Sequence, residues 1–254
     1  MKVLELIGDL LFPPRCVSCS KMLPLGGRGQ RTPYFCAECR KAFEYQILAQ
    51  CPHCFAAYCD CRCQPDIMKK AGSVALRKLA PYGLKDEPQV VDRLVRNIKT
   101  YPRGRVFDAC VEEWLPMLSE EIRLARESTA FSEVVITFLP RSRKKVLRYG
   151  FDQAKELARA LSKRTGYPVV PLLKRVRDGR AQKTLTVKER RENLRGAFAL
   201  TEDPADRCVI LVDDIVTTGA GMAEATGMLK KAKAAAVVCL SIAVTAKKLP
   251  RRKS

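Results

Sequence analysis

The sequence predicts an α/β protein in which a small cysteine-rich domain precedes a doubly wound parallel sheet. Two observations carry this prediction. From about residue 90 onward, amphipathic segments alternate with short apolar runs, which is the order of helices and buried strands in a parallel sheet. Before that point, nine of the twelve cysteines lie between Cys16 and Cys63. A chain of 254 residues is long enough for one sizeable core and a small second unit.

The helices and strands are predicted in a regular order. Residues 90–98 repeat apolar side chains at helical spacing, and the nearby Pro102 and Gly104 are typical of a helix end. A second helix is expected over about residues 107–126, with Trp114 in the core. The remaining predicted elements are strands at residues 133–138, 208–212 and 234–244 and helices at residues 152–165 and 222–231. In such sheets, ligands bind outside the carboxyl ends of the strands.

A domain boundary is predicted where the composition changes, after the polar stretch that ends at Gly72. Residues 1–72 form the expected cysteine-rich domain, which begins with a short amphipathic helix at residues 1–12, and residues 73–254 form the α/β domain. The first domain has few large apolar residues, so bound metal is expected to substitute for hydrophobic burial.

The cysteines are spaced as metal ligands. Two Cys-x-x-Cys pairs supply four thiolates for a tetrahedral zinc ion, and we favour zinc over disulfides because a reducing cytoplasm disfavours disulfides. This first set is Cys16, Cys19, Cys36 and Cys39.

A second zinc set is less regular. Cys51 and Cys54 form a good pair, but the next three cysteines alternate with other residues, so two of them could close the site. We choose Cys61 and Cys63 and leave Cys59 as the spare. The only histidine, His53, lies inside the first pair and is interpreted as a surface residue; its placement removes the usual general base from a catalytic scheme.

The stretch "CVILVDDIVTTGAGMAEATGMLKKA", residues 208–232, places two acids and a glycine-containing loop between a predicted strand and a helix. Free backbone N–H groups and the helix dipole attract an anion at such a helix N-terminus, which suits a phosphate. The acids Asp213 and Asp214 would repel that phosphate, so we expect them to bind the hydroxyls of a sugar attached to it.

The formal net charge of +20 is concentrated in residues 141–149, in residues 174–195 and in the C-terminal tail. Such a field attracts polyanions, either nucleic acid or phosphorylated small molecules, although basic runs are also common on solvated faces. No segment approaches the roughly 20 uninterrupted apolar residues of a membrane span, and the N-terminus lacks an export signal. We therefore expect a cytoplasmic protein without a membrane span.

The motif "VILVDDIVTTGAG" resembles the phosphoribosyl pyrophosphate signature of type I phosphoribosyltransferases. Together with the cysteine pairs and the stretches "LPRSRKKVLRYGFDQA" and "RVRDGRAQKTLTVKERRENLRGAF", the chain resembles the ComF family of late-competence proteins. The resemblance implies a type I phosphoribosyltransferase fold, magnesium bound with the phosphoribosyl ligand, and a role in the uptake of single-stranded DNA, with other DNA-uptake proteins as further partners.

The resemblance also implies roles for particular residues. Asp213 and Asp214 would contact the ribose, and Arg148 would join them as a catalytic residue. The 5'-phosphate would be wrapped by Thr217, Thr218, Gly219, Ala220 and Gly221, of which the last two stand where the family commonly carries hydroxyl residues. Further ligand contacts would come from Arg141, Gln153, Arg177 and Arg190. Asp152 replaces an asparagine of the family pattern and is expected to cap a helix.

Two functions stay open on the sequence. The chain could bind phosphoribosyl pyrophosphate or a related ligand while it handles single-stranded DNA, which a basic groove with aromatic side chains can track. Alternatively, it could be an active phosphoribosyltransferase on an unidentified acceptor, with cations and magnesium on the leaving pyrophosphate. Neither a nucleobase pocket nor an acid/base residue is recognisable for that reaction.

Overall fold

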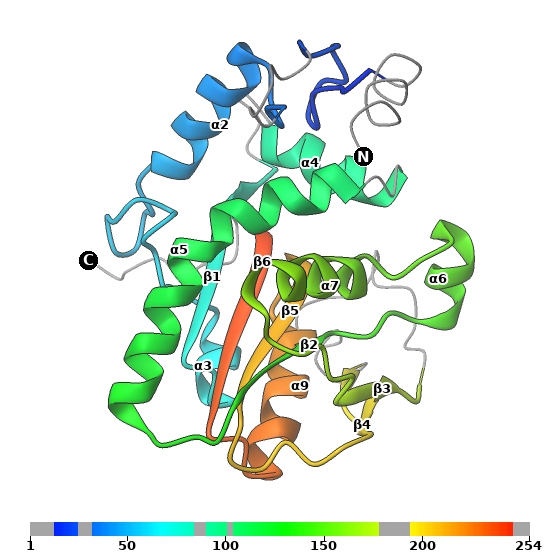
Figure 1. The fold of residues 1–254 in the computed structure, drawn as a ribbon. Coiled ribbons are helices and arrows are strands. Elements are labelled where there is room, and N and C mark those ends of the chain that lie inside the picture. Colours follow the sequence, from blue (N-terminus) through cyan, green and yellow to red (C-terminus); the bar gives the residue numbers. More distant parts are fainter. Residues whose placement is uncertain (1–12, 25–31, 84–89, 101–103, 178–193, 246–254) are drawn as a thin grey trace.

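The computed structural model describes residues 13–24, 32–83, 90–100, 104–177 and 194–245. Its centre is a four-stranded parallel sheet with the strand order β1-β6-β5-β2 (Figure 1). The strands are β1 (Ala75–Tyr82), β2 (Val134–Phe138), β5 (Cys208–Val216) and β6 (Ala236–Thr245). A separate antiparallel pair consists of β3 (Leu173–Arg175) and β4 (Phe198–Leu200).

Helices cover both faces of the parallel sheet, so the predicted α/β class is confirmed. One face carries α4 (Val90–Thr100), α5 (Gly104–Ser128) and α7 (Gln153–Thr165). The other face carries α9 (Ala220–Lys231) and the short α3 (Asp66–Lys70). Such two-sided cover suits strands that are continuously apolar, and β2 and β6 are buried along nearly their whole length.

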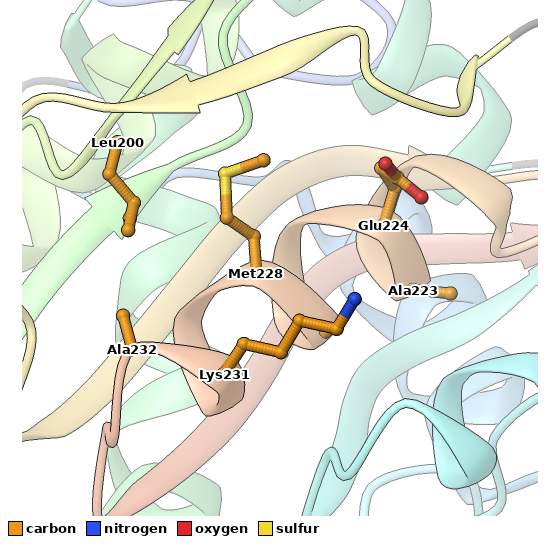
Figure 2. A pocket seen from close by; sticks show the side chains of 7 residues that line it. Leu200, Ala223, Glu224, Met228, Lys231 and Ala232 are labelled. Carbon is orange, nitrogen blue, oxygen red and sulfur yellow. The ribbon is translucent and has the colours of Figure 1, made fainter.

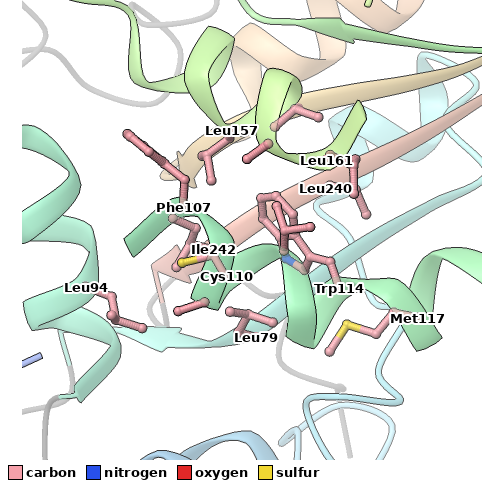
Figure 3. Close-up of a cluster of buried hydrophobic side chains, with 14 of the residues drawn as sticks. Leu79, Leu94, Phe107, Cys110, Trp114, Met117, Leu157, Leu161, Leu240 and Ile242 are labelled. Carbon is pink, nitrogen blue, oxygen red and sulfur yellow. The ribbon is translucent and has the colours of Figure 1, made fainter. Parts of the chain in front are cut away.

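The core between the sheet and α5 is built around Trp114, which is fully buried as expected (Figure 3). Its indole nitrogen donates to the carbonyl oxygen of Ser241 at 3.2 Å, so the polar edge of the ring is satisfied inside the core. Leu157 and Leu161 of α7 and Leu240 of β6 pack in the same cluster.

The edge strand β1 was not predicted from the sequence. It contains Arg77, Lys78 and Pro81, which are unusual in a strand, yet Arg77 and Lys78 are both buried. Among the described residues β1 pairs only with β6, so it is an edge strand of this sheet, and an edge strand tolerates proline. The buried cations of β1 reach the cysteine-rich region, as described below.

The cysteine-rich region buries more apolar surface than the sequence indicates. It contains α2 (Ala37–Leu48), in which Phe43 is fully buried and stacks on Phe35 at a ring-centroid distance of 5.0 Å. These side chains belong to the same buried cluster as α4 and α5. The boundary near residue 72 stays a prediction, and the core is continuous across it.

Among the helices that the structure describes, none is long and apolar enough to cross a membrane. The amphipathic helix expected at residues 1–12 lies outside the described residues.

Candidate functional site

The two acids of the 208–232 stretch lie near the end of β5, at the carboxyl edge of the sheet. The strand is longer than predicted, because Asp213 and Ile215 continue the pairing with β6 opposite Ser241 and Ala243. Asp213 is partly exposed, whereas the side chain of Asp214 is only 4% exposed. The backbone N–H of Asp214 donates to Oδ1 of Asp213 at 2.8 Å, so the two acids are directly linked.

Asp214 is held by two cations. Its Oδ2 lies 2.6 Å from a guanidinium nitrogen of Arg141 and 3.3 Å from Nζ of Lys99 at the end of α4. From the sequence alone we expect both carboxylates to face a pocket without partners in the core, and this expectation is wrong for Asp214. Lys99 was missed because this contact joins residues far apart in the chain, and only the fold brings them together.

The pKa values of the two acids are pushed in opposite directions. Burial and the neighbouring charge of Asp214 raise the pKa of Asp213 well above its usual range. Burial also acts to raise the pKa of Asp214, but Arg141 and Lys99 outweigh it and hold that pKa below its usual value. Asp214 is thus the acid that stays ionised, and Asp213 is the acid that binds a proton more readily.

Residues 217–221 comprise the three residues between β5 and α9 and the first two of α9, and we call them the phosphate loop after the role that the sequence predicts. Gly219 has a φ of +77°, which glycine adopts without strain. A Cβ atom at this position would also lie 3.1 Å from side-chain atoms of Pro65 and Met68. Oγ1 of Thr218 accepts from the backbone N–H of Ala220 at 3.3 Å. At Gly221 a Cβ would lie 3.0 Å from Cδ2 of Leu139, so a side chain at this position would require that methyl group to move.

The segment after β2 brings Arg141 to the acidic pair. Its backbone N–H donates to Oδ2 of Asp152 at 3.0 Å, and Oδ1 of Asp152 accepts from the N–H groups of Ala154 and Lys155. The prediction that Asp152 caps the following helix is confirmed. Gln153 is fully buried, and within the described residues neither polar atom of its amide has a hydrogen-bond partner.

A short helix, α6 (Arg143–Tyr149), lies between Arg141 and α7, and the sequence analysis does not predict it. Arg148 is exposed in its last turn, where its guanidinium lies 5.6 Å from the ring centroid of Tyr149. Burial and the charges of Arg141 and Arg175 lower the pKa of Lys145, so three cations share this part of the surface.

Of the two arginines predicted to contact the ligand from residues 174–195, only Arg177 lies within the described residues. Arg177 is exposed and donates to the carbonyl oxygen of Arg195 at 2.6 Å. Arg190 lies outside the described residues, as does most of the stretch "RVRDGRAQKTLTVKERRENLRGAF" in which it stands.

The first cysteine set is brought together as the spacing predicts. The sulfur atoms of Cys16, Cys19, Cys36 and Cys39 all lie within 4.8 Å of one another, and those of Cys19 and Cys36 are 3.8 Å apart. Zinc–sulfur bonds of about 2.3 Å in a tetrahedron place the sulfur atoms about 3.8 Å apart. The four side chains therefore fit a zinc ion, which would crosslink the loop that carries Cys16 and Cys19 to the start of α2.

The second set is formed by Cys51, Cys54, Cys61 and Cys63, whose sulfur atoms also lie within 4.8 Å of one another. The sulfur atoms of Cys54 and Cys61 are 3.6 Å apart, which again suits a tetrahedral ion. The choice of Cys61 and Cys63 over Cys59 agrees with this geometry, and His53 is not part of the group.

A separate hollow of about 390 Å³ lies on α9 beside β4. Figure 2 shows Met228 between Leu200 and the side chains of Glu224 and Lys231. Glu224 also accepts from the backbone N–H of Gly196 at 2.7 Å. This hollow is lined by neither the acidic pair nor the phosphate loop.

Comparisons with known proteins agree with this architecture. Residues 146–254 match the phosphoribosyl transferase domain family. The chain is 27% identical over 232 residues to the DNA utilization protein YhgH of Salmonella typhimurium, covering 90% of this chain and 96% of that protein. The Escherichia coli protein of the same name is 28% identical over the same length. An 88-residue match to competence protein F of Haemophilus influenzae is 38% identical and covers 33% of this chain and 38% of that protein.

The acidic pair and the loop at the sheet edge thus lie in the part of the chain that matches the phosphoribosyl transferase domain family, and a cysteine-rich region precedes the sheet. The resemblance to the ComF family is confirmed, because the homologues of the chain are named competence protein F and DNA utilization protein YhgH.

Proposed function

We propose that the chain binds phosphoribosyl pyrophosphate, or a related phosphoribosyl ligand, at the carboxyl edge of the sheet. The observation that carries the proposal is the partly exposed Asp213 beside a glycine-containing loop that opens α9. In this proposal the N–H groups of residues 217–221 hold the 5'-phosphate, and Asp213 accepts hydrogen bonds from the ribose hydroxyls. Magnesium, when bound with the ligand, would neutralise charge on the pyrophosphate.

The second acid has a different role in the proposal. Asp214 is buried and pairs with Arg141 and Lys99, so it orients these cations toward the ligand instead of taking a ribose hydroxyl. In the proposal, Arg141 and Gln153 contact the pyrophosphate; within the described residues the buried amide of Gln153 has no other partner. Arg177 and Arg190 would add ligand contacts, and Arg148 would assist from the surface of α6.

Titration calorimetry with phosphoribosyl pyrophosphate and magnesium tests this proposal. Replacing Asp213 by Asn keeps the shape but removes a charged acceptor, so affinity should fall at least about tenfold, the equivalent of about 1.4 kcal/mol. Thr201→Ala, at the exposed residue that follows β4, is the control and should bind like the parent. Equal affinity of Asp213→Asn and the parent, or no binding to the parent, would contradict the proposal.

We further propose that the protein assists the handling of single-stranded DNA in the cytoplasm, as the names of its relatives suggest. The support is a basic surface that consists of Arg143, Lys144, Lys145, Arg148, Lys174, Arg175 and Arg177, with no acid in α6. A strand could track such a surface through its phosphates. Other DNA-uptake proteins would then be its protein partners.

An active phosphoribosyltransferase on an unidentified acceptor is the second candidate. A leaving pyrophosphate requires several cations. The candidate is favoured because burial and the charges of Arg141 and Arg175 lower the pKa of Lys145, so these three cations act on one another. Magnesium-dependent release of pyrophosphate in the presence of nucleobases or DNA would support turnover. Ligand binding without such release would restrict the site to a binding role.

A further inference from the structure

A very short stretch of chain connects the second cysteine set to the residues that pack against the phosphate loop. Only Gln64 separates Cys63 from Pro65, which precedes α3. Pro65 and Met68 pack against Gly219, where a Cβ atom would be only 3.1 Å from the side-chain carbons of both and from the Met68 sulfur. The backbone of the phosphate loop at Gly219 is therefore in direct contact with Pro65 and with Met68 of α3.

The contact continues along the length of α9. A Cβ at Gly227 would lie 3.9 Å from the Cβ of Ala71, and one at Gly72 would lie 3.1 Å from Cγ of Lys230. Small residues at these points allow the two segments to approach closely. α3 is thus fixed along α9 from the phosphate loop to the last turn of the helix.

The other side of this segment is fastened to β1. Nζ of Lys78, which is fully buried, donates to the carbonyl oxygens of Cys63 at 2.8 Å and Cys61 at 3.2 Å and lies 3.2 Å from the sulfur of Cys61. The neighbouring Arg77 donates to the carbonyl oxygens of Cys59 at 2.7 Å and Asp60 at 3.1 Å. It also pairs with Glu121 of α5, whose side chain is fully buried.

A buried ammonium group is costly unless an anion compensates its charge. Four thiolates around a zinc ion carry a net charge of −2, so an occupied second set supplies the anion that Lys78 lacks elsewhere in the described residues. Without the ion, the loop from Cys51 to Cys63 loses its crosslink. Pro65 is then held by the packing of α3 on α9 and by hydrogen bonds such as the one that Nε2 of Gln64 donates to the carbonyl oxygen of Ser73.

We propose that Pro65 and Met68 are positioning residues for the phosphate loop, and that metal held by Cys51, Cys54, Cys61 and Cys63 fixes them in place. The first cysteine set has no such contact with the loop among the described residues, so the two sets differ in function. The effect on ligand binding rests on the function proposed above, but the effect on the conformation of the loop does not.

Hydrogen exchange measured by mass spectrometry separates the two sets. Cys19 and Cys54 are the exposed ligands of their sets, so Cys19→Ser and Cys54→Ser are matched variants. In Cys54→Ser, a peptide covering residues 212–226 should exchange at least about tenfold faster than in the parent, because the loop loses its support. In Cys19→Ser, the same peptide should exchange at the parental rate. Equal rates for that peptide in both variants would overturn the proposal.

A second variant covers the case in which Cys54→Ser fails to fold. Met68→Ala keeps the eight cysteines of the two sets but removes the side chain that lies against Gly219. Metal content should therefore be unchanged, while hydrogen exchange in residues 212–226 should become faster. Parental exchange in Met68→Ala would overturn the positioning role.

Calorimetry on the same proteins tests the proposed function separately. Failure of the parent to bind the phosphoribosyl ligand would contradict the proposed function and leave the hydrogen-exchange result valid.

Discussion

At the scale of single residues, the fold gives different roles to two acids that look equivalent in the sequence. Asp213 is partly exposed with a raised pKa, whereas Asp214 is buried with a lowered one. The difference follows from Arg141 and Lys99, which reach only Asp214 in the described contacts. Adjacent residues in a strand point to opposite faces, so a pair of neighbouring acids seldom shares one environment.

Asp214 should therefore matter for stability as well as binding. Replacing it with Asn leaves two cations without their anion, and we expect a loss of about 1–3 kcal/mol in the free energy of unfolding at pH 7, as for a broken charged hydrogen bond. A group with a lowered folded pKa stabilises above its unfolded pKa, about 3.9 for Asp, and loses that contribution as the pH falls. Urea denaturation should thus show a gap between parent and variant at pH 7 that shrinks toward pH 3.

Asp213→Asn is the control for that measurement. Removal of a carboxylate whose pKa is raised should leave stability unchanged or slightly improved at pH 7, since the repulsion between the acids disappears. A similar loss of stability in both variants would mean that the ion pairs with Arg141 and Lys99 are not what distinguishes the acids.

At the scale of helices and strands, the sequence predicts the elements whose apolar pattern is uninterrupted. β2, β6, α5 and α7 lie close to their expected positions because continuous apolar runs and helical spacing are local signals. β1 was missed because Arg77 and Lys78 interrupt its pattern, and their burial depends on carbonyl groups of the cysteine-rich region. The helix α6 was missed because no residue in it is buried, so it has no apolar face to recognise.

The candidate site also consists of parts that the sequence predicts and parts that only the fold brings together. The acids and the phosphate loop follow from one contiguous stretch, and the cysteine sets follow from spacing that the structure brings within 4.8 Å. The contacts of Lys99, Lys78 and Met68 could not be predicted, because each joins segments far apart in the chain.

Metal content tests the two cysteine sets as units. We expect native mass spectrometry to find two zinc ions per chain, one for each set, and one ion in Cys54→Ser. Alanine at the spare Cys59 is the matched control and should keep both ions, since its sulfur is outside the group. A parent with one ion, or loss of an ion in Cys59→Ala, would show that the ligands are assigned wrongly.

At the scale of the whole molecule, the charge is distributed unevenly between the two edges of the sheet. α6 and β3 carry the basic surface near β2, whereas the cysteine-rich region and α3 lie near β1 at the opposite edge (Figure 1). The phosphate loop and the acidic pair lie on β5, between these edges. A strand bound along the basic surface would therefore pass beside the proposed ligand site without using the cysteine-rich region.

This arrangement predicts where single-stranded DNA binds. Neutralising phosphates releases counterions, so log affinity should fall steeply with log salt, by about 0.7 per phosphate contact for a single strand. Replacing Arg143 and Lys144 with alanine should reduce that slope by about one to two contacts, and Arg190→Ala with Arg191→Ala should act in the same direction. Fluorescence anisotropy of a labelled oligonucleotide over a salt series measures the slope.

The matched control replaces Lys69 and Lys70, which are exposed on α3 at the other edge, and should keep the parental slope. If the control reduces the slope and the α6 variant does not, then the strand follows the cysteine-rich edge and the basic surface serves the phosphoribosyl ligand alone.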